Sequence, residues 1–368
     1  MSGVPEVSRT LRRLEKMRLR DFRNLRTLEF TPTPRFNVIS GDNGQGKSNL
    51  LEAIEYLGSL QSFRSARVED LIHESASDAE LVASSGGDGP AHELRAQLSR
   101  AGRRDIKLDG KRPRSRASYS RALPTVLFHP GELTLTAGGA DGRRGFLDHL
   151  LERLDDTYSA SLATYTKALA SRNRLLKAEP PNRRGITAYD ELLAASGAVI
   201  GQARAALVYA LAPRVAALFA EISGDGPEVS MHYEPRVEPD VERMREVLRG
   251  ALEKDLLRGF TADGPHADDI GFRMRENKAR RYASQGQHRA LVLSLKVAEL
   301  QELEHRSGQT PLLLLDDVSS ELDRAKSARF FELLSRTSGQ VFLTTTHPDL
   351  ISVTTDRRDF HISNGTLL

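Results

Sequence analysis

The apolar positions in the first part of the chain follow the spacing of short strands. Between residues 17 and 30 they flank Arg23-Asn24, a pair typical of a turn, which predicts two strands. A run at 36–39 predicts a buried strand, and the apolar positions of 49–57 follow helical spacing. A break rich in Gly, Ser and Asp is predicted at 84–90, with further strands beyond it. This part is therefore predicted to be an α/β lobe with an antiparallel flank.

The middle of the chain changes to helical spacing. Apolar residues recur every three or four positions over 146–170, which predicts one long amphipathic helix. Pro180-Pro181 ends that region, and a second helix is predicted at 189–212, where Pro213 kinks or stops it. A third is predicted at 241–257. This block is too short and too interrupted for a long coiled-coil arm.

Alternation of helices and short apolar strands returns in the last third. A helix is predicted at 290–304 and apolar strands at 311–315 and 341–346. The chain is therefore predicted to be a discontinuous α/β head interrupted by a helical lobe. The predicted boundaries are a polar extension at 1–16, a head of 17–145 with 263–368, and a helical insertion at 146–262.

Between the strand at 36–39 and the helix at 49–57 lies a match to the phosphate-loop pattern G-x-x-x-x-G-K-[ST]. Its residues are Gly41, Asp42, Asn43, Gly44, Gln45, Gly46, Lys47 and Ser48, followed by Asn49. The glycines let the backbone curl so that N–H groups face phosphate oxygens at the positive end of a helix. Lys47 then supplies a charge to the β- and γ-phosphates, and Ser48 a hydroxyl ligand for Mg²⁺. A plain glycine-rich turn is the alternative, and the flanking strand and helix favour the phosphate loop.

Acidic and imidazole side chains follow the two apolar strands of the last third. Asp316 is predicted to hold Mg²⁺ through water, and Asp317 to polarise the attacking water. His347 follows the second strand, at the sheet edge where α/β proteins bind ligands, and is predicted to donate to a γ-phosphate oxygen. Taken alone, each of these signals has a structural alternative. Asp316 and Asp317 could form an ordinary acidic turn after a strand, and His347 could be a histidine that binds no ligand.

A second anion-binding helix start is predicted just before the helix at 290–304. Ser284 and the N–H groups beside Gly286 lie there. Since the chain already has one phosphate cradle, we expect the second to serve a nucleotide held by another subunit. Gln287 belongs to that cradle or caps its own helix.

Positive charge is concentrated between Arg95 and Arg121, a stretch that contains ten Lys and Arg and only two acidic residues. Only Tyr119 is aromatic there, which favours contact with a nucleic-acid backbone over base stacking. A solvated basic hairpin is the alternative. The predicted DNA contacts are Arg103, Arg104, Lys107, Lys111, Arg112, Arg114 and Arg116.

Composition narrows the class of protein. The chain has 368 residues, 39% hydrophobic and 28% charged, which suits a large α/β domain with a smaller second one. It has no cysteine, which excludes disulfides and thiolate metal sites and fits a reducing cytoplasm. Net charge is only +3, so its distribution says more than its total. No apolar run approaches the roughly eighteen residues that span a bilayer, so we expect a soluble, cytoplasmic protein without membrane contact.

The motifs in this order resemble the ATP-binding-cassette (ABC) superfamily: GDNGQGKS, SQGQ, LLLLDDV, SSELD and TTTH. Within it the chain is similar to the RecF family of bacterial recombination mediators. That similarity is carried by the segments 19–24, 62–64, 128–133, 143–148 and 264–269. Two departures are Ala267, where the family usually has arginine, and the residues before Met17, which lie outside the pattern and make Met17 a candidate start.

The resemblance implies a two-lobed ATPase head that closes into a homodimer when ATP and Mg²⁺ are bound. Ser284, Gly286 and Gln287 of one copy would then reach the γ-phosphate held by Lys47 of the other. It also implies that the closed form binds double-stranded DNA and single-strand/duplex junctions, and works with RecR and RecO to load RecA. Asp317 stands where fast cassettes have glutamate, so we expect weak, switch-like ATP hydrolysis.

Three residues are assigned by resemblance with simpler alternatives open. Arg64 resembles an arginine that related heads direct toward phosphate or DNA, and a surface salt bridge is its alternative. Arg23 and Asn24 are expected near the sugar or base of the nucleotide, though Asn24 also suits a turn. Three other classes remain open for the whole protein: a transporter-type cassette, a chromosome-type SMC head, and a DNA-binding protein with an inactive nucleotide site.

Overall fold

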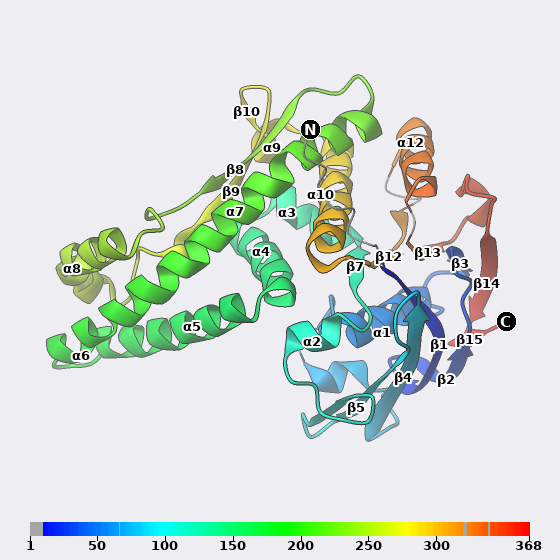
Figure 1. Cartoon of the computed structure of the whole chain (residues 1–368), viewed down its shortest axis with the longest axis horizontal. Helices are drawn as coiled ribbons and strands as arrows, with labels where there is room; N and C mark the ends of the chain where they lie inside the picture. Colours follow the sequence, from blue (N-terminus) through cyan, green and yellow to red (C-terminus); the bar gives the residue numbers. More distant parts are fainter. Residues whose placement is uncertain (1–9, 66, 319–321, 338) are drawn as a thin grey trace. The chain divides into compact units, whose positions relative to one another are not determined.

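The computed structural model describes residues 10–65, 67–318, 322–337 and 339–368, and over these the chain divides into two compact units (Figure 1). Unit 1 consists of Met1–Glu132, Glu221–Asp225 and Gln285–Leu368, and unit 2 of Leu133–Ala220 and Gly226–Ser284. The boundaries predicted at 145/146 and 262/263 therefore fall inside unit 2. The flanking segments 133–145 and 263–284 pack there because long-range contacts join them to each other and to the helices.

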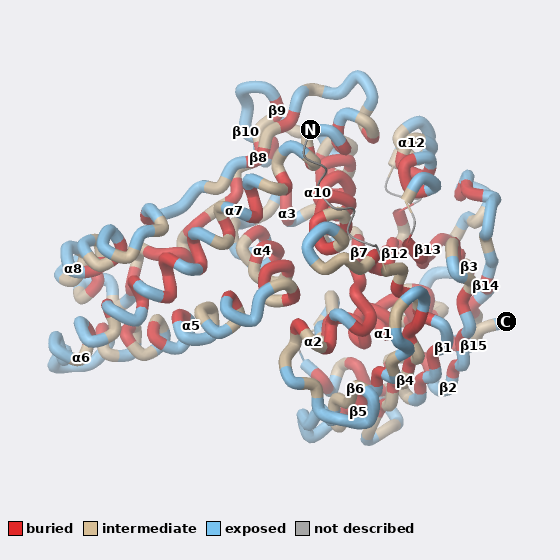
Figure 2. The backbone as a smooth tube through the Cα atoms, viewed as in Figure 1, coloured by how far each residue is buried: buried red, intermediate tan, exposed pale blue. Residues whose placement is uncertain are grey.

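A mainly parallel sheet of order β15-β14-β3-β13-β12-β7 forms the centre of unit 1. Its strands are β3 (Phe36–Ser40), β7 (Thr125–Phe128), β12 (Leu312–Leu315), β13 (Val341–Thr345), β14 (Arg357–Ser363) and β15 (Thr366–Leu367). The neighbours β3, β13, β12 and β7 are parallel and almost wholly buried, as their continuous apolar runs predict (Figure 2). The strands predicted at 36–39, 311–315 and 341–346 are thus confirmed.

Helices of unit 1 connect these strands. They include α1 (Lys47–Ser59), α2 (Arg116–Ser120), α10 (Gln285–Ser307) and α12 (Arg324–Ser335), with short 3-10 turns η1 (Val68–Leu71), η2 (Pro130–Leu133) and η4 (Pro348–Leu350). Buried side chains of α1 share one core with both sheets of this unit. The helices predicted at 49–57 and 290–304 are confirmed and extend further at both ends.

The predicted antiparallel flank is a second sheet of unit 1, of order β11-β1-β4-β5-β6 with β2 paired to β1. Its strands are β1 (Thr10–Phe22), β2 (Leu25–Phe30), β4 (Asp78–Gly87), β5 (His92–Ser99), β6 (Arg104–Leu108) and β11 (Gln309–Thr310). Residues 10–16, predicted to be a polar extension, form the first half of β1 because Leu14 is buried there. Residues 84–87, predicted to be a break, continue β4: all four pair with β1, and Ser84 and Ser85 also pair with β5.

Unit 2 combines helices with a small antiparallel sheet of order β10-β9-β8. Its elements are α3 (Thr134–Ala137), α4 (Ala140–Leu154), α5 (Asp156–Leu176), α6 (Arg183–Ala188), α8 (Val241–Arg258), α9 (Ala279–Tyr282), η3 (Pro265–Ala267), β8 (Val229–Glu234), β9 (Asp269–Met274) and β10 (Asn277–Lys278), with most of α7 (Asp190–Ser223). The helix predicted at 241–257 is confirmed, whereas the sheet was not predicted.

The helices of unit 2 differ from the prediction at two positions. The single helix predicted at 146–170 is α4 and α5, because Asp155 leaves helical geometry and its carboxylate accepts a hydrogen bond from the Thr157 N–H at 2.8 Å. Of the two effects predicted for Pro213, a kink or a stop, the stop is excluded, because α7 runs on to Ser223. Leu211 and Val215 are buried on either side of the proline, so tertiary packing offsets the lost backbone hydrogen bond.

The prediction that no apolar run is long enough to cross a membrane is also wrong. Among the described residues, the helical stretch Arg183–Ser223 is long enough and apolar enough to cross a membrane, judged by length and composition alone. Core helices of soluble proteins pass the same test, and one such helix is weak support for a membrane span. Arg204 lies in this stretch, buried, and donates to both carboxylate oxygens of Asp148 at 2.8 and 2.9 Å. The charged centre of α7 is therefore held by protein contacts within unit 2.

Candidate functional site

The phosphate-loop residues occupy the turn from β3 to α1, and three glycines there have backbone angles that other residues rarely adopt. Gly41, Gly44 and Gly46 have φ of 148°, 79° and 116°. A Cβ at Gly41 would overlap the carbonyl oxygen of Ile362 on β14. Gly46 is the N-cap of α1, so backbone N–H groups at the helix start are left without a side-chain cap. The loop thus has the open donors and the positive helix end that bind phosphate.

Lys47 folds back over this loop. Its Nζ donates to the carbonyl oxygens of Gly41 at 2.7 Å and Asp42 at 2.8 Å. Burial lowers the pKa of Lys47, while the nearby carboxylates of Asp317, Asp316 and Asp42 oppose that shift. An ammonium partly removed from water is therefore held where phosphate oxygens can take over the carbonyl contacts.

Ser48 lies in the first turn of α1 and Asp316 directly follows β12, and the two side chains meet at the carboxyl edge of the sheet. The Ser48 hydroxyl donates to Asp316 Oδ1 at 2.7 Å, and the Thr344 hydroxyl of β13 donates to the same oxygen at 2.8 Å. The Asp316 backbone N–H donates to the Phe128 carbonyl of β7 at 2.9 Å. These contacts orient one buried carboxylate beside one hydroxyl, an oxygen pair of the kind Mg²⁺ prefers.

Mg²⁺ usually keeps several waters and uses one or two carboxylates together with substrate phosphates. Across the described residues no group of three or more His, Cys, Asp or Glu could hold a metal ion. Ser48 and Asp316 therefore fit an ion that also needs a phosphate, and do not form a cage that binds a metal alone.

Asp317 has a left-handed backbone, with φ of 52°. Its N–H donates to Thr344 Oγ1 at 3.0 Å, which fixes the backbone where β12 ends. Non-glycine residues in this conformation are strained and are found most often at functional sites. The turn gives the two consecutive carboxylates different positions, and the Asp316 carboxylate is the one directed to Ser48.

His347 follows β13 at the same sheet edge. It is exposed, and its backbone N–H donates to Thr345 Oγ1 at 2.9 Å. Because β3, β13 and β12 are parallel neighbours, Lys47, Asp316 and His347 follow the same ends of adjacent strands. The structure thus brings together residues that lie far apart in the sequence.

A row of polar side chains connects the phosphate loop to the end of α1. Arg64 donates to Asn49 Oδ1 at 2.6 Å, and Asn49 Nδ2 donates to Asn24 Oδ1 at 2.7 Å. Asn24 Nδ2 donates to the Gly44 carbonyl at 3.3 Å. Arg64 and Asn24, two of the residues assigned by resemblance, are therefore linked to the loop through Asn49 and Gly44.

Arg23 lies differently from its neighbour Asn24. Its guanidinium donates to both oxygens of Glu52, at 2.9 and 2.7 Å, and to the Asp70 carbonyl at 2.6 Å. Glu52 is buried in α1, so this pair is a structural contact beneath the site. Of the two residues expected near the sugar or base, Asn24 is the one that touches the phosphate loop.

His129 was not selected from the sequence, although it follows the buried strand β7 as His347 follows β13. Its ring lies 4.8 Å from that of Phe63, and its Nδ1 accepts a hydrogen bond from the Gly131 N–H at 3.2 Å. Burial lowers the pKa of His129 to about 4, so the imidazole is neutral near pH 7. The same strand-end signal would have identified it.

The segment 284–287 begins a helix, as predicted. Ser284 is exposed and directly precedes Gln285, the first residue of α10, while Gly286 and Gln287 lie in its first turn. Most of the SSELD segment, at 319–321, lies outside the described residues. Asp323 from that segment caps α12 by accepting a hydrogen bond from the Lys326 N–H at 2.9 Å.

The basic segment predicted to touch DNA covers β6, the following loop and α2. Arg104, Arg112 and Arg116 line a pocket of about 560 Å³ together with Asp105. Lys107 Nζ lies 3.3 Å from Asp105 and is partly neutralised. The side chains of Arg103, Lys111 and Arg114 are exposed. Most of these cations are therefore accessible to an anionic partner.

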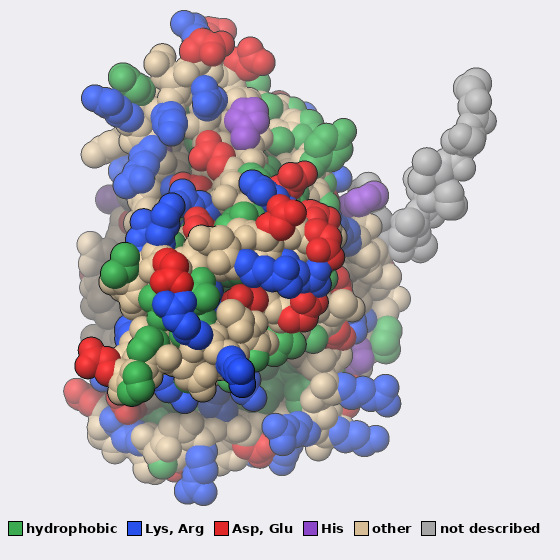
Figure 3. Space-filling view, turned by 90° about the vertical axis from the view of Figure 1, so that its left-hand side faces the viewer, with side chains coloured by type: hydrophobic (Ala, Val, Ile, Leu, Met, Phe, Trp, Pro, Cys, Tyr) green, Lys and Arg blue, Asp and Glu red, His purple; other side chains and the backbone are tan. Residues whose placement is uncertain are grey.

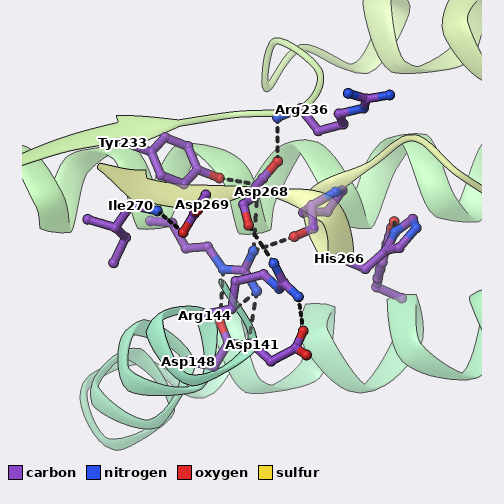
Figure 4. A network of polar contacts seen from close by, with 12 residues as sticks. Asp141, Arg144, Asp148, Tyr233, Arg236, His266, Asp268, Asp269 and Ile270 are labelled. Carbon is purple, nitrogen blue, oxygen red and sulfur yellow. Dashed lines mark hydrogen bonds and ion pairs between the residues drawn. The ribbon is translucent and has the colours of Figure 1, made fainter. Parts of the chain in front are cut away.

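Two segments that carry the family resemblance meet inside unit 2 (Figure 4). Arg143 on α4 donates to both carboxylate oxygens of Asp269, at 2.6 and 2.9 Å. Arg144 donates to the Asp268 carbonyl at 2.6 Å. Ala267 lies in the 3-10 turn just before them and offers no polar side chain. These segments therefore hold unit 2 together.

Comparison with known proteins shows similarity along the whole chain. Residues 13–362 match the family described as RecF/RecN/SMC N terminal domain. The DNA replication and repair protein RecF of Anaeromyxobacter dehalogenans strain 2CP-1 is 40% identical, over 96% of this chain and 98% of that protein. The protein of the same name from Myxococcus xanthus is 39% identical, over 92% of each.

Solved structures are also similar to this chain. One described as the recombination mediator protein RecF-ATP in the RecFOR pathway has a TM-score of 0.88 at 29% identity, over 100% of this chain and 99% of that one. An Smc head domain from Pyrococcus furiosus has a TM-score of 0.56 at 18% identity, over 97% of this chain and 95% of that one, and shares the fold. The predicted fold class, an α/β ABC-type ATPase head, is confirmed.

Proposed function

Because the chain belongs to the RecF family, as its motifs indicated, we propose that it is an ATP-dependent DNA-binding protein of replication and repair. The observation that carries the nucleotide part is the shared edge of β3, β13 and β12, where Lys47, the Ser48–Asp316 pair and Asp317 lie. The names of its relatives support DNA as the second ligand. We place its action in the cytoplasm, with RecR and RecO, in helping RecA load onto DNA.

The chain's own residues account for binding of a triphosphate. Backbone N–H groups of the loop and the start of α1 face the phosphates, and Lys47 exchanges its two carbonyl contacts for phosphate oxygens. Ser48 and Asp316 would hold Mg²⁺, which would supply positive charge to the phosphate oxygens. Asn24 and Asn49, linked to each other beside the loop, are proposed to contact the nucleotide with Arg64.

For hydrolysis, the Asp317 carboxylate is proposed to accept a hydrogen bond from the attacking water and so orient it. His347 is proposed to donate a hydrogen bond to a γ-phosphate oxygen, where negative charge develops. Ser284, Gly286 and Gln287 are proposed to reach the γ-phosphate of a second copy. A triphosphate would then join two chains, since each site is incomplete without its partner.

The homodimer is the feature that an experiment tests most directly. The full chain is expected to be a monomer alone or with ADP, and a dimer with ATP or a slowly hydrolysed ATP analogue, in sedimentation velocity. A gapped duplex should increase the dimer fraction with the triphosphate. A monomer at saturating triphosphate, with and without DNA, would show that the shared site is wrong.

Slow turnover is expected because an aspartate at position 317 reaches less far than a glutamate would. The steady-state rate of phosphate release should be below about 10 s⁻¹, the median for enzymes generally, and should rise when duplex DNA is added. Asp317→Asn should lower the rate further while ATP still binds. A rate above that median would contradict a switch and favour a motor.

A further inference from the structure

The hairpin of β9 and β10 and the following helix α9 concentrate positive charge in unit 2. This basic hairpin is defined by five cations within nine residues, Arg273, Arg275, Lys278, Arg280 and Arg281. Glu276 is the one acidic residue in that stretch. Arg273 is half-buried and the other four are exposed. The density of charge exceeds that of the segment predicted from the sequence to touch DNA.

The pairing of the strands places two of these cations against each other. Lys278 on β10 is directly opposite Arg273 on β9, and the neighbour of Arg273 on β8 is Ser230. Like charges directly opposite each other on neighbouring strands destabilise a sheet. The hairpin therefore has an unfavourable charge arrangement that a bound anion would relieve.

Acidic partners do not compensate for it. Over the described residues 133–220 and 226–284 of unit 2, none of the five side chains makes an ion pair. Other arginines of this unit do, such as Arg143 with Asp269 at 2.6 Å and Arg245 with Glu191 at 2.6 Å. Five cations within nine residues, none of them paired with a described carboxylate of this unit, point to an external ligand.

The basic hairpin also lines a pocket of about 110 Å³. Its charged lining residues are Arg143, Arg273, Lys278 and Arg280, with Asp269 and Glu234. Both carboxylate oxygens of Asp269 already accept hydrogen bonds from Arg143, at 2.6 and 2.9 Å. The pocket thus has more positive than negative charge, and three of its cations belong to the basic hairpin.

We infer that the basic hairpin is a further DNA-backbone contact, which rests on the proposed DNA-binding function. A row of exposed cations that covers a strand pair and a helix suits a chain of phosphates better than one small anion. Tyr282 is the one aromatic residue in 269–284 that is largely exposed, which favours phosphate contact over base stacking.

The basic hairpin also lies close in the chain to a residue that is proposed to contact the nucleotide. The helix α9 ends at Tyr282, and one residue separates it from Ser284, the proposed contact to the γ-phosphate of the second copy. DNA held on the hairpin would therefore restrict the backbone that positions Ser284. The contact explains how DNA would stimulate ATP hydrolysis at a site that it does not enter.

The test is a double variant, Arg273→Ala with Lys278→Ala, in the full chain with a slowly hydrolysed ATP analogue and a duplex over a series of salt concentrations. We expect the affinity for duplex to fall about tenfold. The negative slope of log K against log salt should become less steep by about 2. The thermal midpoint should not fall, because the like-charged cross-strand pair is removed. Arg275→Ala with Arg281→Ala, outside that pair, should reduce the slope similarly.

Lys254→Ala with Arg258→Ala is the matched control. Both residues are exposed on α8 of the same unit, and the loss of charge is the same. Figure 3 looks toward the α6 and α8 end of this unit, where cations are interspersed with Asp and Glu side chains, so no net contact with DNA is expected there. This control should keep the wild-type affinity and slope.

Three other outcomes would overturn the inference. Wild-type affinity and slope in both hairpin variants would leave the proposed function standing and remove this contact. An equal loss in the α8 control would show a general effect of net charge. A wild-type protein that fails to bind duplex with the triphosphate would refute the proposed function itself, and this inference with it.

Discussion

Lys47→Ala is expected to lower the steady-state rate of ATP hydrolysis by about 10²- to 10³-fold. The ammonium is mostly buried and is held by two loop carbonyls at 2.7 and 2.8 Å, where the phosphates are proposed to bind. A charge removed from water interacts strongly with the negative charge that develops during phosphoryl transfer. ATP affinity should fall about tenfold to a hundredfold, the range for one charge-assisted hydrogen bond. Phosphate release and nucleotide titration measure both.

Lys16→Ala is the matched control for this variant. Lys16 lies on β1 of the same unit, pairs with Glu29 and is half exposed, so its loss should change neither hydrolysis nor ATP affinity. Lys47→Arg tests the coupling to DNA, because it keeps the charge and changes the shape of the group. If its DNA affinity at fixed salt equals that of the wild type while ATP no longer binds, nucleotide-driven clamping is wrong.

Arg172→Met is expected to lower the free energy of unfolding by about 3–5 kcal/mol. Arg172 is fully buried on α5 and donates to Asp190 at 2.9 Å and to Asp255 at 2.7 Å. The methionine would leave two buried carboxylates without their cation, which costs more than the pair itself contributes. Urea unfolding followed by circular dichroism measures the difference at pH 7.

The pH dependence of that difference identifies its cause. Burial raises the pKa of Asp190 even with its partner present, and removal of the arginine should raise it further. A carboxyl with a higher pKa when folded binds more protons than when unfolded, so stability increases as the pH falls. The deficit of Arg172→Met should therefore shrink between pH 7 and pH 5, and a constant deficit would indicate lost packing alone.

Arg183→Met is the control for the buried pair. Arg183 pairs with Glu253, which lies two residues from Asp255 on the same helix, and both side chains are largely exposed. An exposed pair contributes about 0–1 kcal/mol. Equal destabilisation by the two variants would contradict the role given to burial.

Local patterns were enough to predict the proposed nucleotide site. The phosphate loop depends on glycines at positions where the backbone has positive φ, and those residues are adjacent in the chain. Asp316 and Asp317 were selected as candidates because continuous apolar runs in α/β proteins predict buried strands with ligand-binding ends. The family resemblance rests on the same short segments, and the comparisons with known proteins bear it out.

Contacts between distant residues account for what was mispredicted. Residues 10–16 look polar in sequence but pair with β4, and the sheet of unit 2 joins strands from 229–234 and 269–274. Asp155 separates two helices where regular apolar spacing predicted one, and α7 continues past Pro213, where a kink or a stop was predicted. The break at Asp155 is a local cap. In the other cases the energy of tertiary pairing or packing exceeds the local preference of a few residues.

The sequence alone therefore predicted the chemistry that we propose for this protein, because phosphate loops and strand-end carboxylates act through residues close together in the chain. The folded structure established which charges are compensated. Arg23, Arg143 and Arg172 have buried or half-buried partners far away in sequence, whereas Arg273 and Lys278 oppose each other without one. Charge pairing depends on distances in space, which the order of residues does not specify.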